Sequence, residues 1–272
     1  MQVTVTTDWL EKNHQTVKIL DASWYLPSEG RNTFNEFKSK HIPNAQFFDI
    51  DIISDKNSHL PHMLPSPSSF NDQVEKLGIS NNVKLIIYDT DGLFSAARVW
   101  WMFKVMGHIE VFILDGGLPK WISENRPISN DHYKAQRGIF KSSLMPSTVV
   151  DIPQILETTA QIIDARHPKR FSGEAPEPRI NLRSGHIPNS INIFYKSLLN
   201  KQNCLRPKSE LLSIFLNAGI DLNKPIITSC GSGVTASIII LALKQLDHIQ
   251  TALYDGSWSE WGLRDDLPIA TN

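Results

Sequence analysis

The sequence predicts an α/β protein made of two similar domains in tandem, each with a central parallel sheet flanked by helices. Short apolar segments alternate along the chain with longer helical ones, which is typical of a parallel sheet covered on both faces. A series of sequence landmarks also occurs twice in the same order. The length of 272 residues is comfortable for two domains.

The repeated landmarks are short motifs that keep the same order in both halves of the chain. The matched pairs are Ile-Leu-Asp-Ala (19–22) with Ile-Ile-Asp-Ala (162–165), His-Ile-Pro-Asn-Ala (41–45) with His-Ile-Pro-Asn-Ser (186–190), Leu-Gly-Ile (77–79) with Ala-Gly-Ile (218–220), and Leu-Asp-Gly-Gly (114–117) with Tyr-Asp-Gly-Ser (254–257). We therefore interpret the two halves as copies of one fold.

Each copy has the same predicted order of elements: strand, strand, helix, strand, helix, strand. Apolar runs of a few residues with polar ends predict buried strands, and the longer apolar or amphipathic runs predict helices. The ranges are 17–21, 45–48, 68–77, 84–88, 95–106 and 111–114 in the first copy, and 161–164, 191–194, 208–218, 225–228, 236–246 and 252–254 in the second. Parallel sheets bind ligands at the carboxyl ends of their strands, so we look for the site there.

The domain boundaries follow from the repeat and from one irregular stretch. Residues 136–148 lack periodicity and are rich in Ser, Lys and Pro, so we predict a linker there. The first domain is then expected over residues 1–135 and the second over 149–272. The tryptophans are expected to fill the cores or the domain interface, because large aromatic side chains mainly supply buried area.

Composition excludes several classes of function. The net charge of −1 gives no reason to expect nucleic-acid or membrane binding. No segment has the length of a membrane span, and residues 1–8 lack the features of a signal peptide. The two cysteines, Cys204 and Cys230, form neither a zinc pattern nor a disulfide scaffold, so a reducing cytoplasm is the expected location.

The sequence Ser-Cys-Gly-Ser-Gly-Val-Thr at 229–235 is the candidate catalytic motif. It places Cys230 between a predicted strand and a predicted helix, where glycines free the backbone to curl inward. The amides of residues 231–235 are expected to point at the sulfur, and with the helix dipole they favour the thiolate. The alternative is a buried structural thiol at a glycine-rich turn.

The same turn in the first copy has no cysteine. Alignment of the two turns places Thr90 opposite Cys230. Because a threonine hydroxyl needs a base to become a nucleophile, we expect the first copy to be catalytically inactive and to support the second.

The paired layout resembles the two-domain rhodanese family of sulfurtransferases over nearly the whole chain. Arg-Val-Trp-Trp-Met-Phe at 98–103 and Leu-Asp-Gly-Gly at 114–117 resemble the inactive first domain of that family. Cys-Gly-Ser-Gly-Val-Thr at 230–235 is similar to the loop of its 3-mercaptopyruvate sulfurtransferases. The resemblance implies two rhodanese-like domains with the active site between them.

The resemblance also implies a reaction and its participants. The Cys230 thiolate takes sulfur from 3-mercaptopyruvate, becomes a persulfide and releases pyruvate. A thiol acceptor such as thioredoxin or a dithiol, or cyanide, then takes the outer sulfur. The family needs no organic cofactor and no metal, so none is expected here.

The resemblance assigns further site residues. Arg170 and Arg179, in a predicted loop over 169–179, match two arginines that clamp the substrate carboxylate and keto oxygen, although Ala175 replaces the usual Thr. Asp51, His62 and Ser232 match a proton relay. The residues Gly231, Ser232, Gly233, Val234 and Thr235 match the cysteine loop of the family and are expected to bind the substrate. The alternatives are solvated surface arginines, and an Asp51–His62 pair that only joins the domains.

Other polar residues are expected to be structural. His41 and His186 precede Ile-Pro in both copies, which favours a structural hydrogen bond over catalysis, since only one copy carries the thiol. Asp21 and Asp164 are expected to bind loop amides at the ends of their strands. Cys204 lies in a polar loop and is expected to be an incidental thiol, redox-sensitive if exposed.

Three other functions compete with this hypothesis. A cysteine phosphatase needs an arginine six residues after the cysteine, where this chain has Ala236. A thiosulfate:cyanide sulfurtransferase typically has Arg and Lys where this chain has Gly231 and Ser232, which lowers the charge available for a dianion, but the two activities overlap in the family. A non-catalytic sulfur-carrying or interaction protein would not need the cysteine loop and both arginines.

Overall fold

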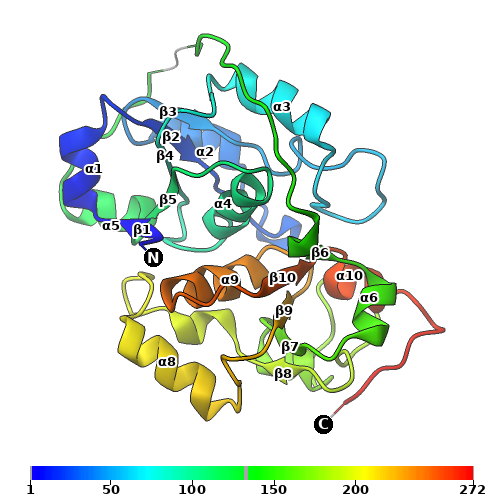
Figure 1. Cartoon of the computed structure of the whole chain (residues 1–272). Coiled ribbons are helices and arrows are strands. Elements are labelled where there is room, and N and C mark those ends of the chain that lie inside the picture. Colours follow the sequence, from blue (N-terminus) through cyan, green and yellow to red (C-terminus); the bar gives the residue numbers. More distant parts are fainter. Residues whose placement is uncertain (1, 132–133, 272) are drawn as a thin grey trace.

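The computed structural model describes residues 2–131 and 134–271. Within these residues the structure has two five-stranded sheets, with the orders β1-β5-β4-β2-β3 and β6-β10-β9-β7-β8. All neighbouring strands are parallel. The identical order in the two halves confirms the predicted duplication of one α/β fold, which Figure 1 shows as two stacked units.

The first half contains strands β1 (Thr4–Val5), β2 (Lys18–Asp21), β3 (Ala45–Phe47), β4 (Leu85–Tyr88) and β5 (Val111–Leu114), and helices α1 (Thr7–Asn13), α2 (Thr33–Ser39), α3 (Pro67–Lys76), α4 (Ala96–Val105) and α5 (Gly117–Ser123). The second half contains strands β6 (Val149–Val150), β7 (Gln161–Asp164), β8 (Ile191–Asn192), β9 (Ile226–Ser229) and β10 (Thr251–Tyr254), and helices α6 (Ile152–Glu157), α7 (Pro168–Phe171), α8 (Lys208–Asn217), α9 (Ala236–Gln245) and α10 (Ser257–Trp261). Short 3₁₀ turns cover Pro27–Glu29, Pro146–Thr148 and Tyr195–Leu198.

The predicted strands and helices are all present, with ends that differ from the predictions by no more than two residues. The sequence did not reveal the edge strands β1 and β6 or short helices such as α5 and α10. A strand of two residues shows no alternation, and a helix of one or two turns shows no apolar period, so neither leaves a recognisable pattern.

The segment before β6 lies against the first domain. The Gly138 amide donates to the Glu75 carbonyl, and the Ser143 amide donates to the Met106 carbonyl. Arg137 forms ion pairs with Asp72 and Glu75. Figure 1 shows this segment descending beside the upper unit to β6. The predicted linker is therefore bound along its length to the first domain.

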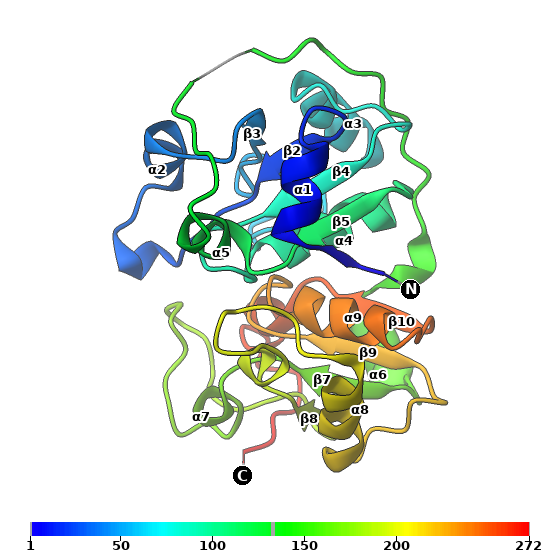
Figure 2. The same ribbon diagram turned by 90° about the vertical axis from the view of Figure 1, so that its left-hand side faces the viewer.

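Helices α4 and α9 form the interface between the domains. Figures 1 and 2 show them lying one above the other between the two sheets. Both are apolar on nearly every face, and almost all their side chains are buried in one continuous cluster that includes residues of both domains. A helix that is apolar all round must be covered on all sides, so the two domains bury each other's central helix.

A buried ion pair crosses this interface. Arg98 of α4 lies with its Nη1 2.6 Å from Oδ1 of Asp255, which follows β10, and both side chains are buried. Arg98 Nη2 donates to the His62 carbonyl at 2.5 Å, and the other Asp255 oxygen accepts from the Leu64 amide at 2.7 Å. The guanidinium also stacks over Trp101. The pair therefore fixes both the relative position of the domains and the segment that carries His62.

We predict that Arg98→Ala lowers the free energy of unfolding by about 3–5 kcal/mol, because it leaves Asp255 buried without its cation. Lys76→Ala removes an exposed partner of Asp72 and is the control, with an expected loss below about 1 kcal/mol. Denaturant unfolding of both variants measures the difference, and equal losses would contradict the importance of the buried pair.

Candidate active site

Cys230 lies at the carboxyl end of β9, one turn before α9, as the sequence predicts. It is 1% exposed and lines a cavity of about 380 Å³ between the domains. The first domain contributes Trp24 and Phe94 to its wall, and the second contributes Arg170 and Arg179. Cys230 therefore borders an interdomain cavity whose volume suits a small molecule.

The expected ring of amides around the sulfur is not formed. The Gly233 amide donates to Ser257 Oγ at 3.1 Å, as does the amide of Cys230 itself at 3.2 Å. Within the described residues no group donates a hydrogen bond to Cys230 Sγ. The Ser257 hydroxyl, which the sequence-based site did not include, accepts these two amides and donates its own proton to the Tyr254 carbonyl.

Four loop amides remain without a protein acceptor in the described part of the chain: those of Gly231, Ser232, Val234 and Thr235. They stand at the N-terminus of α9, beside the cavity. Unsatisfied amides at a helix N-terminus favour an anion. Gly233, with φ +76°, lets the loop turn here, and a Cβ on it would lie 2.8 Å from Arg98.

The structure brings Asp51, His62 and Ser232 into one hydrogen-bonded chain. His62 Nε2 lies 3.0 Å from Asp51 Oδ1, and His62 Nδ1 lies 3.1 Å from Ser232 Oγ. With the proton on Nε2, His62 donates to Asp51 and accepts from the Ser232 hydroxyl. Trp24 Nε1 donates to the other Asp51 oxygen at 2.9 Å. This chain crosses from the first domain to the second.

Burial and charge set the protonation of this chain. Burial lowers the pKa of His62, and the Asp51 carboxylate only partly offsets the effect. Burial alone would raise the pKa of Asp51, but the hydrogen bond and charge interaction with His62, together with the hydrogen bond from Trp24 and the nearby Lys56, lower it. His62 also has φ +62°, an uncommon backbone conformation for a non-glycine residue, held by Arg98 on its carbonyl. The geometry thus presents a neutral imidazole to Ser232 near pH 7.

Arg170 and Arg179 both line the cavity, but they differ in their partners. Arg170 lies on the short helix α7, which corrects the predicted loop over 169–179. Its guanidinium is paired with the buried Glu177. Arg179 forms no ion pair among the described residues and donates weakly to Ser232 Oγ at 3.4 Å. Burial lowers the pKa of Arg179, although Cys230 acts in the opposite direction.

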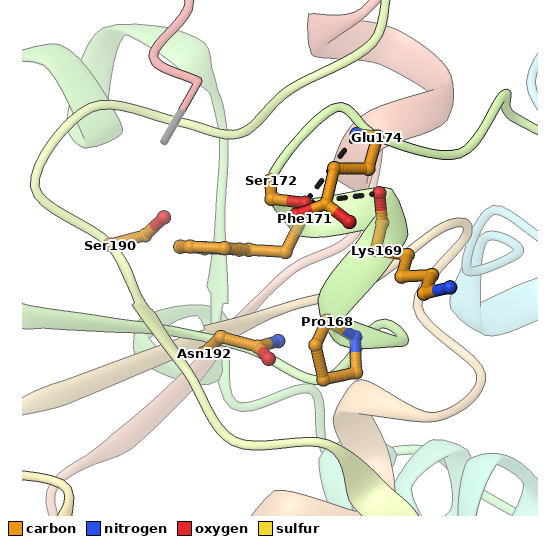
Figure 3. A pocket seen from close by; sticks show the side chains of 7 residues that line it. All are labelled: Pro168, Lys169, Phe171, Ser172, Glu174, Ser190 and Asn192. Atoms are coloured by element: carbon orange, nitrogen blue, oxygen red, sulfur yellow. Dashed lines mark hydrogen bonds between the residues drawn. The ribbon is translucent and has the colours of Figure 1, made fainter.

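Helix α7 divides its side chains between two hollows. Arg170 lines the cavity of Cys230, whereas its neighbours Lys169 and Phe171 line a separate, shallow hollow with Glu174 and Ser190. Figure 3 shows this second hollow, with Lys169 extending away from Phe171. Of the two cationic side chains on α7, Arg170 therefore lines the interdomain cavity and Lys169 does not.

A buried network that the sequence did not reveal supports Arg170. Arg166 donates to Asp164 at the end of β7 and, through Nη1 at 2.8 Å, to Glu177. Asp164 also accepts the Arg166 amide, which confirms its expected structural role, and Asp21 accepts the Ser23 amide likewise. The sequence contained one indication that Glu177 belongs to the site: it lies between two prolines in the segment that joins Arg170 and Arg179.

The sheet register corrects the predicted counterpart of Cys230. The Trp258 amide donates to the Cys230 carbonyl, and the equivalent Leu118 amide donates to the Asp89 carbonyl. Asp89, and not Thr90, therefore occupies the position of the thiol. The turn between Asp89 and α4 is one residue longer than the turn between Cys230 and α9. Aligning the two copies on these helices therefore places Thr90, and not Asp89, opposite Cys230.

Asp89 places a carboxylate in the amide-rich turn of the first domain. Its oxygens accept from the amides of Phe94 at 2.7 Å, Ala96 at 2.8 Å and Asp91 at 3.0 Å. Burial raises the pKa of Asp89 to about 6. The neighbouring Thr90 hydroxyl is hydrogen-bonded to Tyr25. The first copy therefore holds an internal anion where the second holds a sulfur.

The remaining predicted residues have structural surroundings. Nδ1 of His41 donates to the Phe37 carbonyl, and Nδ1 of His186 donates to the Phe171 carbonyl, both at 2.8 Å, which confirms the expected hydrogen bonds. Cys204 is buried against Gly116 at the domain interface, and burial raises its pKa to about 11. It is thus not an exposed redox-sensitive thiol.

Within residues 2–131 and 134–271, no cluster of His, Cys, Asp and Glu has the arrangement of a metal site. No helix in the same residues is both long and apolar enough to cross a membrane.

Comparisons with known proteins agree with this architecture. The family model described as a rhodanese-like domain matches residues 6–124 and 148–264. A 3-mercaptopyruvate sulfurtransferase of Escherichia coli is 43% identical over 97% of this chain and 96% of its own length. An Arabidopsis thaliana thiosulfate/3-mercaptopyruvate sulfurtransferase is 42% identical over 97% of this chain and 77% of its own length.

Solved structures show the same fold. The crystal structure of a 3-mercaptopyruvate sulfotransferase from Escherichia coli superposes with a TM-score of 0.87 at 41% identity, covering 96% of this chain and all of that one. The Tum1 protein of Saccharomyces cerevisiae superposes with a TM-score of 0.90 at 32% identity, covering 100% of this chain and 98% of that one. The chain therefore belongs to the rhodanese family of sulfurtransferases and carries two rhodanese-like domains in tandem.

Proposed function

We propose that this sulfurtransferase uses 3-mercaptopyruvate as its donor and carries the transferred sulfur as a persulfide on Cys230. The observation that carries the proposal is the interdomain cavity, where Cys230 meets Ser232 of the hydrogen-bonded chain and Arg179, which has no ion-pair partner in the described part of the chain. The relatives named for this substrate in Escherichia coli and mouse, 43% and 42% identical, support the choice.

The donor is held by the arginines of the second domain. A guanidinium binds a carboxylate with two parallel hydrogen bonds, and Arg179 has no competing carboxylate among the described residues. Arg170 pairs with Glu177 through Nε and Nη2 and also lines the cavity. The donor carboxylate and keto oxygen therefore bind to these two side chains, with the donor sulfur toward Cys230.

Sulfur transfer to the enzyme breaks the carbon–sulfur bond of the donor. The Cys230 thiolate attacks the donor sulfur, a sulfur–sulfur bond forms, and the electron pair of the broken bond goes to the carbon. The donor thiol proton passes to Ser232, whose own proton passes to His62 Nδ1. The enolate of pyruvate then takes up a proton and leaves as pyruvate. Ser232 and His62 thus act as a proton shuttle.

The second half of the reaction returns the thiolate. A thiol acceptor, such as a dithiol or thioredoxin, attacks the outer sulfur, and the electron pair of the sulfur–sulfur bond returns to Cys230. The outer sulfur of a persulfide lies about 2 Å beyond Sγ. The amides of Gly231, Ser232, Val234 and Thr235, which have no acceptor within the described residues and form no hydrogen bond to Sγ there, are available to stabilise this anion.

Thiosulfate is the second candidate donor. Relatives in Arabidopsis thaliana are named for both donors, and a rat relative at 38% identity is named thiosulfate sulfurtransferase. Because Gly231 and Ser232 place no cation in the loop, we expect the dianion to be the poorer donor. The ratio of kcat/KM for the two donors decides between them.

We predict that Cys230→Ser abolishes sulfur transfer because the hydroxyl is not ionised at neutral pH. Intact-protein mass spectrometry after exposure to 3-mercaptopyruvate should show one added sulfur atom on the wild type and none on the variant. Cys204→Ser is the matched control and should still gain the sulfur, since Cys204 is buried away from the cavity. Persulfide on Cys230→Ser would disprove the assignment.

Arg179→Ala is expected to lower kcat/KM for 3-mercaptopyruvate by about 10- to 100-fold, the value of a charge-assisted hydrogen bond. The loss with thiosulfate should be smaller, because that donor has no carboxylate. Lys169→Ala removes a nearby cation outside the cavity and should change neither donor. Equal losses with both donors would contradict the proposed binding mode.

Asp51→Asn is expected to move the acidic limb of the kcat/KM profile to lower pH. The Asp51 carboxylate favours the protonated form of His62, so its removal lowers the pKa of His62 further below the ordinary value of 6.5. Neutral His62 is the active form, and activity is lost as the pH falls through this pKa. Asp55→Asn on the same segment is the control, and an unchanged limb in Asp51→Asn would exclude His62 as its origin.

A further inference from the structure

Glu177 is the buried carboxylate that connects Arg170 to the framework of the second domain. Its side chain is 1% exposed, and its Oε1 accepts from Arg166 at 2.8 Å and from Arg170 Nε at 3.2 Å. Its other oxygen pairs with Arg170 Nη2. Within the described residues, no other side chain or carbonyl accepts a hydrogen bond from the Arg170 guanidinium.

The other end of this connection is rigid. Arg166 is fully buried, donates to both oxygens of Asp164 and to the Gly185 carbonyl, and stacks over Trp258. Asp164 pairs in register with Ser229, the residue before Cys230. Consecutive ion pairs therefore connect the sheet that carries the thiol to the wall of the cavity, in the order Asp164, Arg166, Glu177, Arg170.

Glu177 also sets the charge of that wall. Arg166 and Arg170 are two cations, and Asp164 and Glu177 are two anions, so this cluster is neutral. Arg179, which has no ion-pair partner among the described residues, then supplies the single uncompensated charge among the three cavity arginines. A Cβ on residue 231 would lie 3.2 Å from Arg170 Nη2 and 3.7 Å from Arg179 Nη1, so both guanidiniums lie close to the thiol loop.

We infer that Glu177 is a positioning and selectivity residue: it holds Arg170 against the cavity and reduces the positive charge there to a level that suits a monoanionic donor. This inference rests on the proposed function. 3-Mercaptopyruvate carries one carboxylate charge near neutral pH, whereas thiosulfate carries two negative charges. Removal of the Glu177 charge adds one net positive charge to the cavity wall, which favours the dianion relative to the monoanion.

Two variants separate the effect of the Glu177 charge from its effect on the position of Arg170. Glu177→Gln keeps the shape and removes the charge, so the ratio of kcat/KM for thiosulfate to that for 3-mercaptopyruvate should rise about 10-fold, the effect of one charge-assisted contact. Glu177→Asp keeps the charge and shortens the reach, so KM for both donors should rise with little change in that ratio. Glu174→Gln, in the same segment but in the separate hollow of Figure 3, is the control and should match the wild type.

A double-mutant cycle tests whether Glu177 acts through Arg170. In the Arg170→Ala background, Glu177→Gln should change KM for 3-mercaptopyruvate far less than it does alone, because the side chain it positions is gone. Additive losses would show a general structural role and overturn the inference, as would an unchanged donor ratio in Glu177→Gln. If that variant does not fold, Glu177→Asp with Arg170→Ala provides the same cycle.

The controls distinguish this inference from the proposed function. A wild-type protein that releases no pyruvate from 3-mercaptopyruvate would refute the donor assignment. A wild-type protein that releases pyruvate, with Glu177→Gln behaving like Glu174→Gln, would refute the role of Glu177 alone.

Discussion

The ion pair between Arg98 and Asp255 is the interaction on which the active-site geometry depends. It is buried at the domain interface, and three further contacts of its members reach the site: the His62 carbonyl, the Leu64 amide and the space beside Gly233. A buried pair gains little net stability over apolar packing, but an unpaired member is strongly unfavourable. The domains therefore have one arrangement that satisfies both charges, and in that arrangement His62 of the first domain meets Ser232 of the second at 3.1 Å.

The two copies show how one turn serves two purposes. In the first, the carboxylate of Asp89 accepts from three backbone amides and closes the turn with an internal anion. In the second, Cys230 stands at the same register, and four amides of the shorter loop have no acceptor within the described residues. Oriented amides form an anion site, and the first copy shows this loop geometry filled by an anion. The second copy leaves the equivalent donors open to the cavity, which is consistent with a site for transferred sulfur.

The sequence predicted the duplication, the longer elements and the position of Cys230, because periodic apolar runs and repeated motifs report on local structure directly. It did not predict Asp89 as the counterpart of the thiol, since a shift of one residue is invisible until strands pair in register. It placed the loop amides around the sulfur, but Ser257, which is distant in sequence, takes the Gly233 amide. The sequence also did not predict the roles of Glu177 and Arg166, because a buried ion network depends on which side chains the fold brings together. Asp51, His62 and Ser232 were found by resemblance, and their alignment across two domains required coordinates.

The chain of hydrogen bonds from Ser232 leads from the interior to solvent. Ser232 and the His62 side chain are 5% and 2% exposed, whereas the Asp51 side chain is 62% exposed. A proton that reaches His62 therefore has an exit toward water beside Asp51. The pKa of Asp51 is lowered, so its carboxylate stays ionised and orients the imidazole without taking the proton, as the aspartate does in a serine-protease triad. Burial lowers the pKa of His62, so the neutral imidazole is favoured near neutral pH. The electrostatics thus suit the proposed role of His62 as a proton acceptor that returns to its neutral form.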